Sequence, residues 1–277
     1  LKCQGRNFYQ CWRSKASKHL SSTFGSLKHL TSRNGYNLMG MKFGISTPFT
    51  CSYLPEQDER LLIFMSDTEP TITEYDFLIG AGFRRSGTQV YRPHCGSCNA
   101  CESIRLPVNM FTPSKSQKRT MKRNQDLVVR VSNSDKPEYY PLYESYINQR
   151  HADGSMFPAT KEQYQGFILS PWNKALFIEI YATDEHAHQE LIGVAVTDNL
   201  ASSLSALYTF FKPEEQHRSL GNFAILQQIE LARSLNKAFL YLGYQIDTCQ
   251  KMSYKQNFLP HERFFDDKWQ LIAKKAG

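Results

Sequence analysis

Several features that would assign this chain to a common class of protein are missing from its sequence. No apolar run approaches the roughly 18 residues that a membrane-spanning helix needs, and the longest runs, such as LLIFM, have the length of a strand. Residues 1–40 contain no apolar stretch typical of a secretory signal, so we expect a cytoplasmic protein with reduced cysteines. The sequence also lacks an internal repeat and the GxSxG motif of serine hydrolases.

Acidic residues are absent from the first 40 positions, which hold seven Lys and Arg. These seven account for the whole net charge of +7, because the remaining 26 Lys and Arg equal the 26 Asp and Glu. The same segment is rich in Ser and shows no apolar periodicity. We expect residues 1–40 to be a disordered or non-native segment, with the folded protein starting at Met41.

The order of the predicted elements indicates the fold class. Two helices over 137–151 and 160–170 precede three strands over 175–182, 190–200 and 203–211. A loop over 211–221, a helix over 222–235 and a strand over 237–246 follow. This is the order of the GNAT acyltransferase core, so we predict an α/β (α+β) fold in which a smaller N-terminal domain (41–135) joins a GNAT-like C-terminal domain (136–277).

A strongly basic helix is predicted just before this core, in SKSQKRTMKRNQDL. Ser114 and Gln117 have the spacing of a capping box at its start. The helical spacing places five cations on one face: Lys115, Lys118, Arg119, Lys122 and Arg123. Because no carboxylate lies among them, the face is either a solvated surface or a site for phosphates. Arg218 and Gly221, before the helix over 222–235, form a second candidate anion site at a helix N-terminus.

The stretch YRPHCGSCNAC gathers three of the seven cysteines at three-residue spacing. Cys95, Cys98 and Cys101 could bind a metal with Cys51 or His94 as a fourth ligand, act as redox-sensitive thiols, or be partly buried small residues. Strong zinc motifs have two separated CxxC pairs, and this chain has no second pair. A structural zinc or iron–sulfur site therefore stays one of three open readings, and no cofactor is required.

In the predicted strand FLYLGYQID, one face is mostly apolar and the other carries polar side chains. In a regular strand Phe239, Tyr241, Gly243, Gln245 and Asp247 share one face, which becomes polar toward its end. A half-solvated edge strand would show the same pattern. Alternatively, the glycine lets a ligand approach the backbone beside the polar side chains.

Several motifs, in their order, closely resemble one family. The segments that carry the likeness are GAGFRRSG, YRPHCGSCNAC, ESIRLPV, FTPSKSQKRTMKRN, GSMFP, AVTD, LSALYTFF, SLGNFAILQQIE and LYLGYQID. They are similar to the bacterial aspartate/glutamate leucyltransferases, relatives of the arginyl-tRNA–protein transferases. The resemblance runs from about Cys51 to about Arg263 and excludes residues 1–40. It implies an enzyme that moves leucine from leucyl-tRNA to the α-amine of proteins beginning with Asp or Glu, marking them for degradation.

The resemblance also gives the candidate residues their roles. We expect Gln245 or Asp247 to orient and deprotonate the acceptor amine, and Tyr241 to contact the terminal adenosine or the oxyanion. A cation should hold the acidic side chain of the acceptor, and the candidates are Arg84, Arg85, Lys251 and Lys255. The basic helix, with Arg218 and Gly221, would bind tRNA. The cysteine spacing differs from that of the arginyl relatives, so their metal site is not transferred.

Three other interpretations remain open at this level. The same mechanism could use arginyl-tRNA as its donor. An acyl-CoA-dependent GNAT enzyme would use Arg218 and Gly221 for the cofactor's pyrophosphate, but gives no reason for the basic helix. A metal-braced RNA-binding protein without catalysis would leave the polar face of the strand unexplained. The sequence does not fix an oligomeric state.

Overall fold

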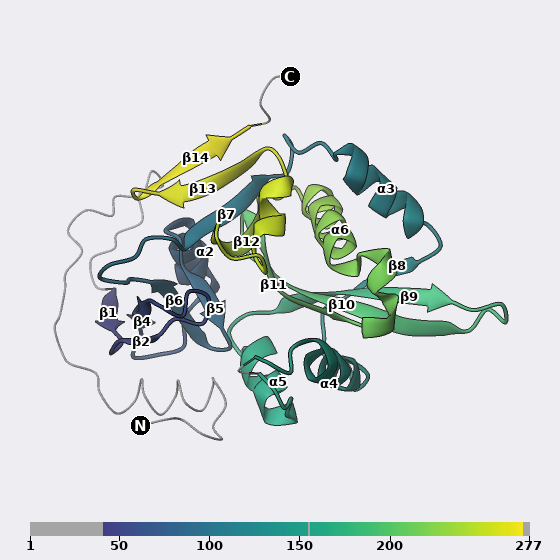
Figure 1. The fold of residues 1–277 in the computed structure, drawn as a ribbon, viewed down its shortest axis with the longest axis horizontal. Coiled ribbons are helices and arrows are strands. Elements are labelled where there is room, and N and C mark those ends of the chain that lie inside the picture. Colours follow the sequence, from purple (N-terminus) through teal and green to yellow (C-terminus); the bar gives the residue numbers. More distant parts are fainter. Residues whose placement is uncertain (1–40, 155, 274–277) are drawn as a thin grey trace.

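The computed structural model describes residues 41–154 and 156–273, so the expectations for residues 1–40 lie outside it. This part of the chain contains a smaller sheet and a larger sheet, each with helices packed against it (Figure 1). None of its helices combines the length and the hydropathy that crossing a membrane would require.

A four-stranded antiparallel sheet forms the smaller, N-terminal part (Figure 1). Its spatial order is β1 (Lys42–Ile45), β4 (Leu61–Met65), β6 (Gln89–Pro93) and β5 (Arg84–Ser86). A short ribbon of β2 (Phe49–Thr50) and β3 (Asp58–Glu59) flanks it, and helix α2 (Ile72–Gly80) precedes β5. Apolar side chains of β4, α2 and β6 pack together with Leu200, Tyr241 and Trp269 of the larger part, so one core joins the two parts.

The larger part is built on an eight-stranded sheet. Its spatial order is β14 (Lys268–Ile272), β13 (His261–Phe265), β7 (Glu102–Pro107), β12 (Phe239–Gln245), β11 (Ser203–Phe211), β10 (Gln189–Asn199), β9 (Ala175–Thr183) and β8 (Val128–Ser132). Strands β7 and β8 thus belong to the large sheet, although they precede its core in the sequence. The predicted division at residues 135 and 136 falls between edge strand β8 and the next helix.

Helices cover both faces of the large sheet (Figure 1). Helix α6 (Leu220–Ser234) packs on one face, with helix α3 (Lys115–Arg123) beside it. Helices α4 (Tyr139–Arg150) and α5 (Lys161–Ile168) pack on the other, through a core of tyrosines and β-branched residues. The order α4, α5, β9, β10, β11, α6 and β12 confirms the predicted mixed α/β class and GNAT-like element order.

The local chemistry of the helix starts explains three of these helices. Thr71, Ser114 and Thr160 each accept a hydrogen bond from the backbone of the residue three positions on, whose side chain bonds back. The predicted capping box of α3 is therefore confirmed. The expectation of a plain loop over 211–221 was wrong, because the 3₁₀ helix η1 (Pro213–Arg218) and the first turn of α6 occupy it.

Candidate active site

The parallel strands β11 and β12 separate near the middle of the large sheet. Their pairing covers three positions and ends at Ser205 and Tyr241. At that level both strands change register with their other neighbours. Strand β11 shifts between its residues Ala206 and Tyr208 against β10, and β12 shifts between Tyr241 and Gly243 against β7. A bulge adds one residue to a strand and bends it, so the two bulges open the sheet where polar side chains gather.

Gly243 lies directly after the bulge, with φ at +89°. A β-carbon at this position would lie 3.4 Å from Nη2 of Arg84 and 3.6 Å from Nζ of Lys255. The two cationic groups therefore approach the backbone at the position where any other residue would place its side chain. Arg84 comes from β5 of the small sheet, and Lys255 from the 3₁₀ helix η2 (Ser253–Asn257).

Arg84 is 8% exposed and has incomplete hydrogen bonding. Its Nη2 donates to the carbonyl oxygen of Ala206 at 2.7 Å, where β11 leaves β12. Its buried Nη1 has no partner in the described structure. An unpartnered N–H of a buried guanidinium costs free energy unless an acceptor binds there, so this atom marks a position for an anionic or carbonyl oxygen.

Lys255 is also 8% exposed. Its Nζ donates to the carbonyl oxygen of Tyr244 at 2.5 Å. Burial, with a further contribution from the charge of Arg84, lowers the pKa of Lys255 to about 7. Neither Lys255 nor Arg84 has an ion-pair partner among the described residues. We call these two side chains, with Gly243, the Arg84–Lys255 centre.

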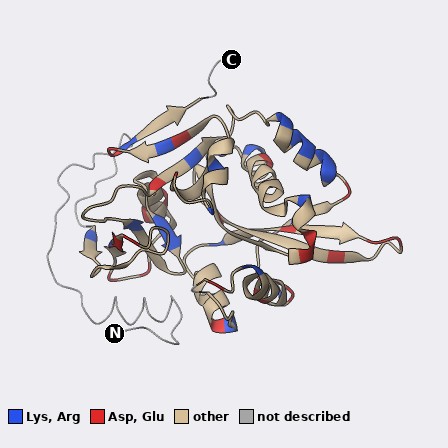
Figure 2. Ribbon diagram, in the orientation of Figure 1, with Lys and Arg blue, Asp and Glu red and all other residues tan. Residues whose placement is uncertain are grey.

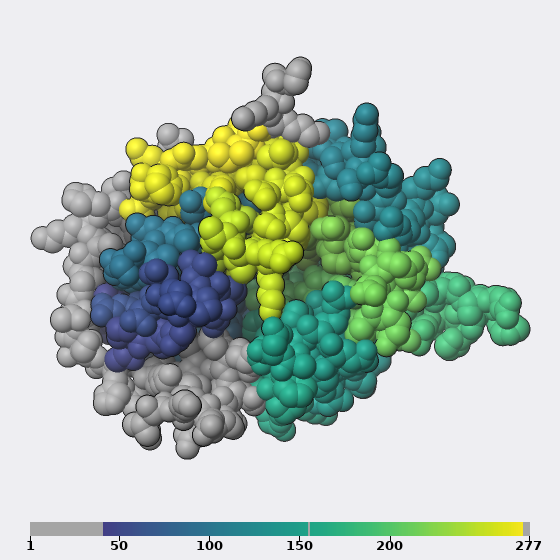
Figure 3. Space-filling view, in the orientation of Figure 1, coloured from purple at the N-terminus to yellow at the C-terminus, as the bar shows by residue number. Residues whose placement is uncertain are grey.

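The segment after β12 covers this centre. Figure 3 shows it, in yellow-green, at the surface between the small sheet and the α4–α5 region. Tyr254 places its ring 5.9 Å from Nζ of Lys255, and Lys251 forms an exposed ion pair with Asp153 at 3.1 Å. Lys251 thus links this segment to the loop after α4, and no contact joins it to Arg84 in the described structure.

Arg85 has surroundings unlike those of its neighbour. Its guanidinium holds both carboxylate oxygens of Asp198, at 2.8 and 2.5 Å, and donates to the carbonyls of Gly87 and Ile168. Neither side chain of this pair is exposed. Asp198 accepts further bonds from Tyr75 and Asn173, so its oxygens are also fully used. The pair fixes the small sheet against β10, and every guanidinium nitrogen of Arg85 already donates to a protein oxygen.

The structure separates the residues predicted on one face of 239–247. The bulge reverses the alternation, so Tyr241 packs against the small sheet and its hydroxyl accepts a bond from Arg105 at 3.0 Å. Tyr244 also points to the small sheet, where it donates to the carbonyl of Gly82 at 3.1 Å. The prediction of one shared face was therefore wrong, because it assumed an uninterrupted strand.

Gln245 and Asp247 remain close together at the end of β12. Gln245 is fully buried, its Nε2 donates to Oδ1 of Asp247 at 3.2 Å, and its Oε1 has no partner in the described structure. Arg263 binds Asp247 through two N–H groups at 3.1 Å. Burial opposes ionisation of Asp247, but the hydrogen bonds from Arg263 and Gln245 outweigh it and lower its pKa. A carboxylate held in this way is a weak proton acceptor.

Helix α3 carries its five cations on the outside of the molecule (Figure 2). All five are exposed, and none has an ion-pair partner in the part of the chain that is described. The inner face holds Gln117 and Asn124, whose amides donate to the carbonyls of Asn257 and Arg218 at 3.2 and 2.9 Å. Arg123 also donates to the carbonyl of His217 at 2.6 Å. Hydrogen bonds on the inner face therefore hold the helix in place, and the charged side chains of its outer face are exposed to solvent.

The second predicted anion site is less open. Arg218 pairs with Asp126 at 3.0 Å and with Glu215 at 2.8 Å, and both carboxylates raise its pKa. Gly221 lies in the first turn of α6, not in a loop before the helix as predicted, and it follows a left-handed Ser219 whose side chain makes no capping bond. A phosphate at this helix start would have to displace or share the two carboxylates of Arg218.

The cysteines do not form a metal site in the described residues. No group of three or more His, Cys, Asp or Glu has the placement that a metal ion needs there. Cys51 is buried and accepts bonds from two backbone N–H groups, and the other three are half-buried. Burial, followed by the charge of Glu59, raises the pKa of Cys101 to about 12. A thiol with a pKa this high is protonated near neutral pH, which makes Cys101 a poor nucleophile.

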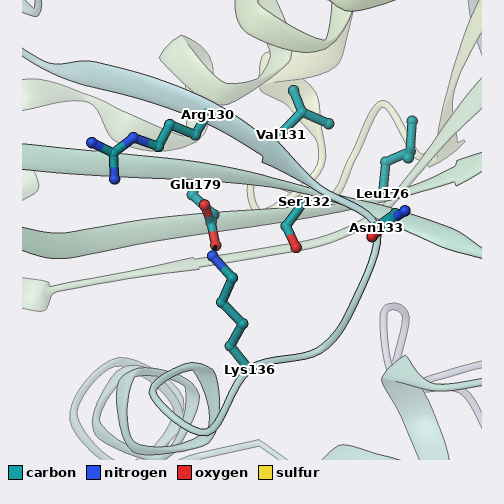
Figure 4. Close-up of a pocket in the computed structure, with 7 residues that line it drawn as sticks. All are labelled: Arg130, Val131, Ser132, Asn133, Lys136, Leu176 and Glu179. Carbon is teal, nitrogen blue, oxygen red and sulfur yellow. Dashed lines mark ion pairs between the residues drawn. The ribbon is translucent and has the colours of Figure 1, made fainter.

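A hollow of about 450 Å³ lies elsewhere, at edge strand β8 (Figure 4). Lys136 and Glu179 pair across it, and Tyr139 donates to the same carboxylate. None of the residues predicted for catalysis, acceptor binding or tRNA binding lines this hollow. Its one buried charge is already neutralised, so it offers little for a charged substrate.

Comparison with known proteins agrees with the motifs in the sequence. Two family models match, described as the N terminus of arginine-tRNA-protein transferase over residues 49–119 and its C terminus over residues 138–265. A protein of Pseudoalteromonas atlantica named aspartate/glutamate leucyltransferase is 60% identical over 85% of this chain and 99% of its own length. A protein of the same name from Aeromonas hydrophila is 48% identical over 85% of this chain and 97% of its own.

Similarity to solved structures is more distant. The crystal structure of FemX covers 74% of this chain and 80% of its own, with 8% identity and a TM-score of 0.42. A likeness this remote does not place individual residues.

Proposed function

The chain belongs to the arginine-tRNA-protein transferase family, and we propose that its Arg84–Lys255 centre holds the acidic N-terminal residue of an acceptor protein during leucyl transfer. The enzyme is an aminoacyltransferase that moves leucine from leucyl-tRNA to proteins with N-terminal Asp or Glu. This is supported by relatives named aspartate/glutamate leucyltransferase and by the match to family models named for a tRNA-protein transferase. In the N-degron pathway, leucine added in this way marks the acceptor for degradation.

The observation that carries the proposal is the unpartnered Nη1 of Arg84. The acceptor's side chain supplies a planar carboxylate, and a guanidinium can bind both of its oxygens at once. Arg84 is only 8% exposed, so the electrostatic attraction between the two charges would be stronger there than in water. An Asn or Gln acceptor would place a neutral amide, with an N–H₂ group, against the same cation and would bind less well.

Lys255 adds a second basic group, which lies with Arg84 next to the same β-carbon position of Gly243. No carboxylate forms an ion pair with Arg84 or Lys255 in the described chain, so the carboxylate of the acceptor can take that place. Arg85 has a different part in the proposal, because Asp198 already holds it. It positions Arg84 by anchoring strand β5. Lys251 lies at the rim, where it could meet the acceptor chain only after releasing Asp153.

The tRNA would bind on the outer face of helix α3. Five exposed cations without a carboxylate partner suit a phosphate backbone, and binding through them should weaken steeply with salt. A direct link joins this surface to the centre, since Gln117 of α3 bonds to Asn257, two residues after Lys255. Arg218 and Gly221 lie next to the C-terminal end of α3 and would extend the same surface.

The chemistry requires little beyond positioning, because the aminoacyl ester is already activated. The neutral α-amine attacks the ester carbonyl carbon, and the bond to the ribose oxygen then breaks. Gln245 is the candidate for orienting the amine, since its buried Oε1 lacks a partner and can accept an N–H. Asp247 would hold Gln245 in place through the bond to its Nε2. Tyr241 would act from a distance, by positioning Arg105 and strand β12.

The test is transfer of labelled leucine from leucyl-tRNA onto peptides that begin with Asp, Glu or Lys, with arginyl-tRNA as a second donor. We expect leucine on the Asp and Glu peptides alone, and a large loss for Arg84→Gln. Incorporation into all three peptides to the same extent would contradict the proposed acceptor site. Transfer from arginyl-tRNA alone would contradict the donor.

The matched control for Arg84 is Arg233→Gln. Arg233 is also a partly buried arginine that donates to carbonyl oxygens, those of Val108 and Phe111, but it lies on α6 away from the centre. Both variants lose a guanidinium of this kind. Only the first should change the acceptor preference.

A further inference from the structure

A buried arginine and a buried lysine lie side by side next to Gly243, and neither has an ion-pair partner among the described residues. The groups around Nζ of Lys255 are the guanidinium of Arg84 from β5, the thiol of Cys249 and the ring of Tyr254 from the segment after β12, and the carbonyl of Tyr244. The described residues place no carboxylate in an ion pair with this nitrogen. A positive charge on Lys255 therefore meets repulsion and desolvation, and only one backbone oxygen stabilises it.

The acceptor brings two groups that match this arrangement. Its α-ammonium must lose a proton before it can attack, and its side-chain carboxylate is the counter-ion that the centre lacks. Asp247 is poorly suited to take that proton, because Arg263 and Gln245 hold its carboxylate in the ionised form. Lys255 is the one basic nitrogen of the centre that can be neutral near pH 7.

We propose that Lys255 is the catalytic proton acceptor, and that the acceptor's own side-chain carboxylate stabilises the lysine ammonium that results. This inference rests on the proposed function, because it uses the same bound carboxylate. In this proposal the acidic side chain of the acceptor has two roles. The carboxylate anchors the acceptor to Arg84, and it also makes Lys255 basic enough to activate the amine that it accompanies.

The proton balance is complete without a further reactant. The α-ammonium gives one proton to neutral Lys255. The α-amine is then neutral, and the lysine ammonium lies next to the carboxylate. The amine nitrogen then forms a bond with the ester carbonyl carbon. As the bond from that carbon to the ribose oxygen breaks, the second proton of the nitrogen goes to this oxygen. Lys255 releases its proton to solvent after the product leaves.

The experiment measures kcat/KM for leucyl transfer to an Asp peptide from about pH 6 to about pH 9. Lys255→Met should lower kcat/KM about 100-fold near pH 6.5, and the loss should shrink as pH rises and the free amine forms unaided. Lys255→Arg keeps a cation that cannot accept a proton, so it should not restore the rate. Lys237→Met is the control, because Lys237 also donates to backbone carbonyls but lies outside the centre.

A second acceptor separates proton transfer from positioning. A peptide with an N-terminal hydrazine in place of the α-amine is already neutral at pH 7, so Lys255→Met should transfer leucine to it nearly as well as the wild type. An equal loss at every pH and with both acceptors would overturn the proposal, as would full rescue by Lys255→Arg. If the wild type does not prefer acidic acceptors at all, the proposed function fails instead. A melting curve for each variant confirms that it is folded.

Discussion

Arg84 and Arg85 are neighbours on strand β5, and both are almost fully buried, yet their surroundings are opposite. Arg85 meets Asp198, which also accepts bonds from Tyr75 and Asn173. Arg84 has one carbonyl oxygen as an acceptor, an Nη1 without a partner in the described structure, and another cation close by.

The difference shows how the enzyme can separate stability from binding with two identical side chains. A buried cation with a complete set of partners fixes the small sheet on the large one. A buried cation left incomplete costs stability, and a ligand that completes it regains that free energy. We therefore expect substitutions at the two sites to differ in kind. Substitutions at Arg85 or its partner Asp198 should lower the stability of the protein, and substitutions at Arg84 should change its substrate preference.

The largest expected effect is at the complete site. Asp198→Asn leaves the charge of Arg85 buried without its counter-ion, and we expect the free energy of unfolding to fall by about 3–5 kcal/mol. The measurement is urea unfolding at pH 7. The double substitution Arg85→Met with Asp198→Leu should recover much of this loss, because it removes both charges. If the losses in unfolding free energy of Arg85→Met and Asp198→Leu simply add in the double variant, the interaction between the two side chains contributes little.

At the incomplete site, Lys255→Met should change how stability depends on pH. An unfolded lysine has a pKa of about 10.4, whereas the pKa of Lys255 in the folded protein is about 7. Between these values the unfolded state binds more protons, so this lysine makes the wild type more stable as pH rises, by up to about 1.4 kcal/mol per unit. Lys255→Met removes this slope and should be more stable than the wild type near pH 7.

The check on this prediction is a set of urea or thermal unfolding curves from about pH 7 to about pH 9.5. The gain from Lys255→Met should be largest at the lower end and should decline with rising pH. A constant difference between the variant and the wild type would mean that Lys255 keeps its charge in the folded state.

A smaller effect is expected at Gly243, whose missing side chain leaves space for Arg84 and Lys255. Gly243→Ala forces a residue with a β-carbon to adopt φ near +89°, which should cost about 1–2 kcal/mol of stability. The new carbon would also lie within 3.6 Å of both cationic groups, so kcat/KM for acidic acceptors should fall further than stability explains. Gly80→Ala is the control, because nothing lies within 4 Å of a β-carbon there. Equal kinetics for the two variants would argue against the centre.

The smallest effects should come from the exposed cations of α3. Replacing Lys118 or Lys122 by Gln should reduce the slope of log affinity for tRNA against log salt by about one each. Acceptor preference should not change. Filter binding across a salt series measures the slope. A slope that is unaffected by replacing all five cations would place the tRNA elsewhere.

The sequence was enough to predict features that depend on neighbouring residues, but not the pairing of residues that are far apart in the chain. The capping box of Ser114 and Gln117 predicted the start of α3 correctly, because its chemistry spans only three residues. The alternation in 239–247 failed at Leu242, where the bulge depends on how β12 meets β7. The glycine at position 243 was the one local sign of a bulge, but a glycine alone does not fix where the register shifts.

The candidate site could be predicted only in part for the same reason. Arg84 and Lys255 were both candidates, yet sequence could not bring them together across the 170 positions that separate them. It could not distinguish Arg84 from Arg85 either, since the partner that occupies Arg85 lies 113 residues away. Roles that depend on which charge has a partner become visible only when the strands are assembled.

The most direct test of the account combines a change in the enzyme with a change in the substrate. Wild type and Arg84→Gln would each be given leucyl-tRNA and peptides that begin with Asp or with Asn, and kcat/KM would be measured for all four pairs. We expect the wild type to prefer the Asp peptide by about 100-fold or more, and Arg84→Gln to lose nearly all of that preference. If Arg84→Gln lowers both rates equally and keeps the preference, Arg84 does not bind the acceptor's carboxylate and the central claim is wrong.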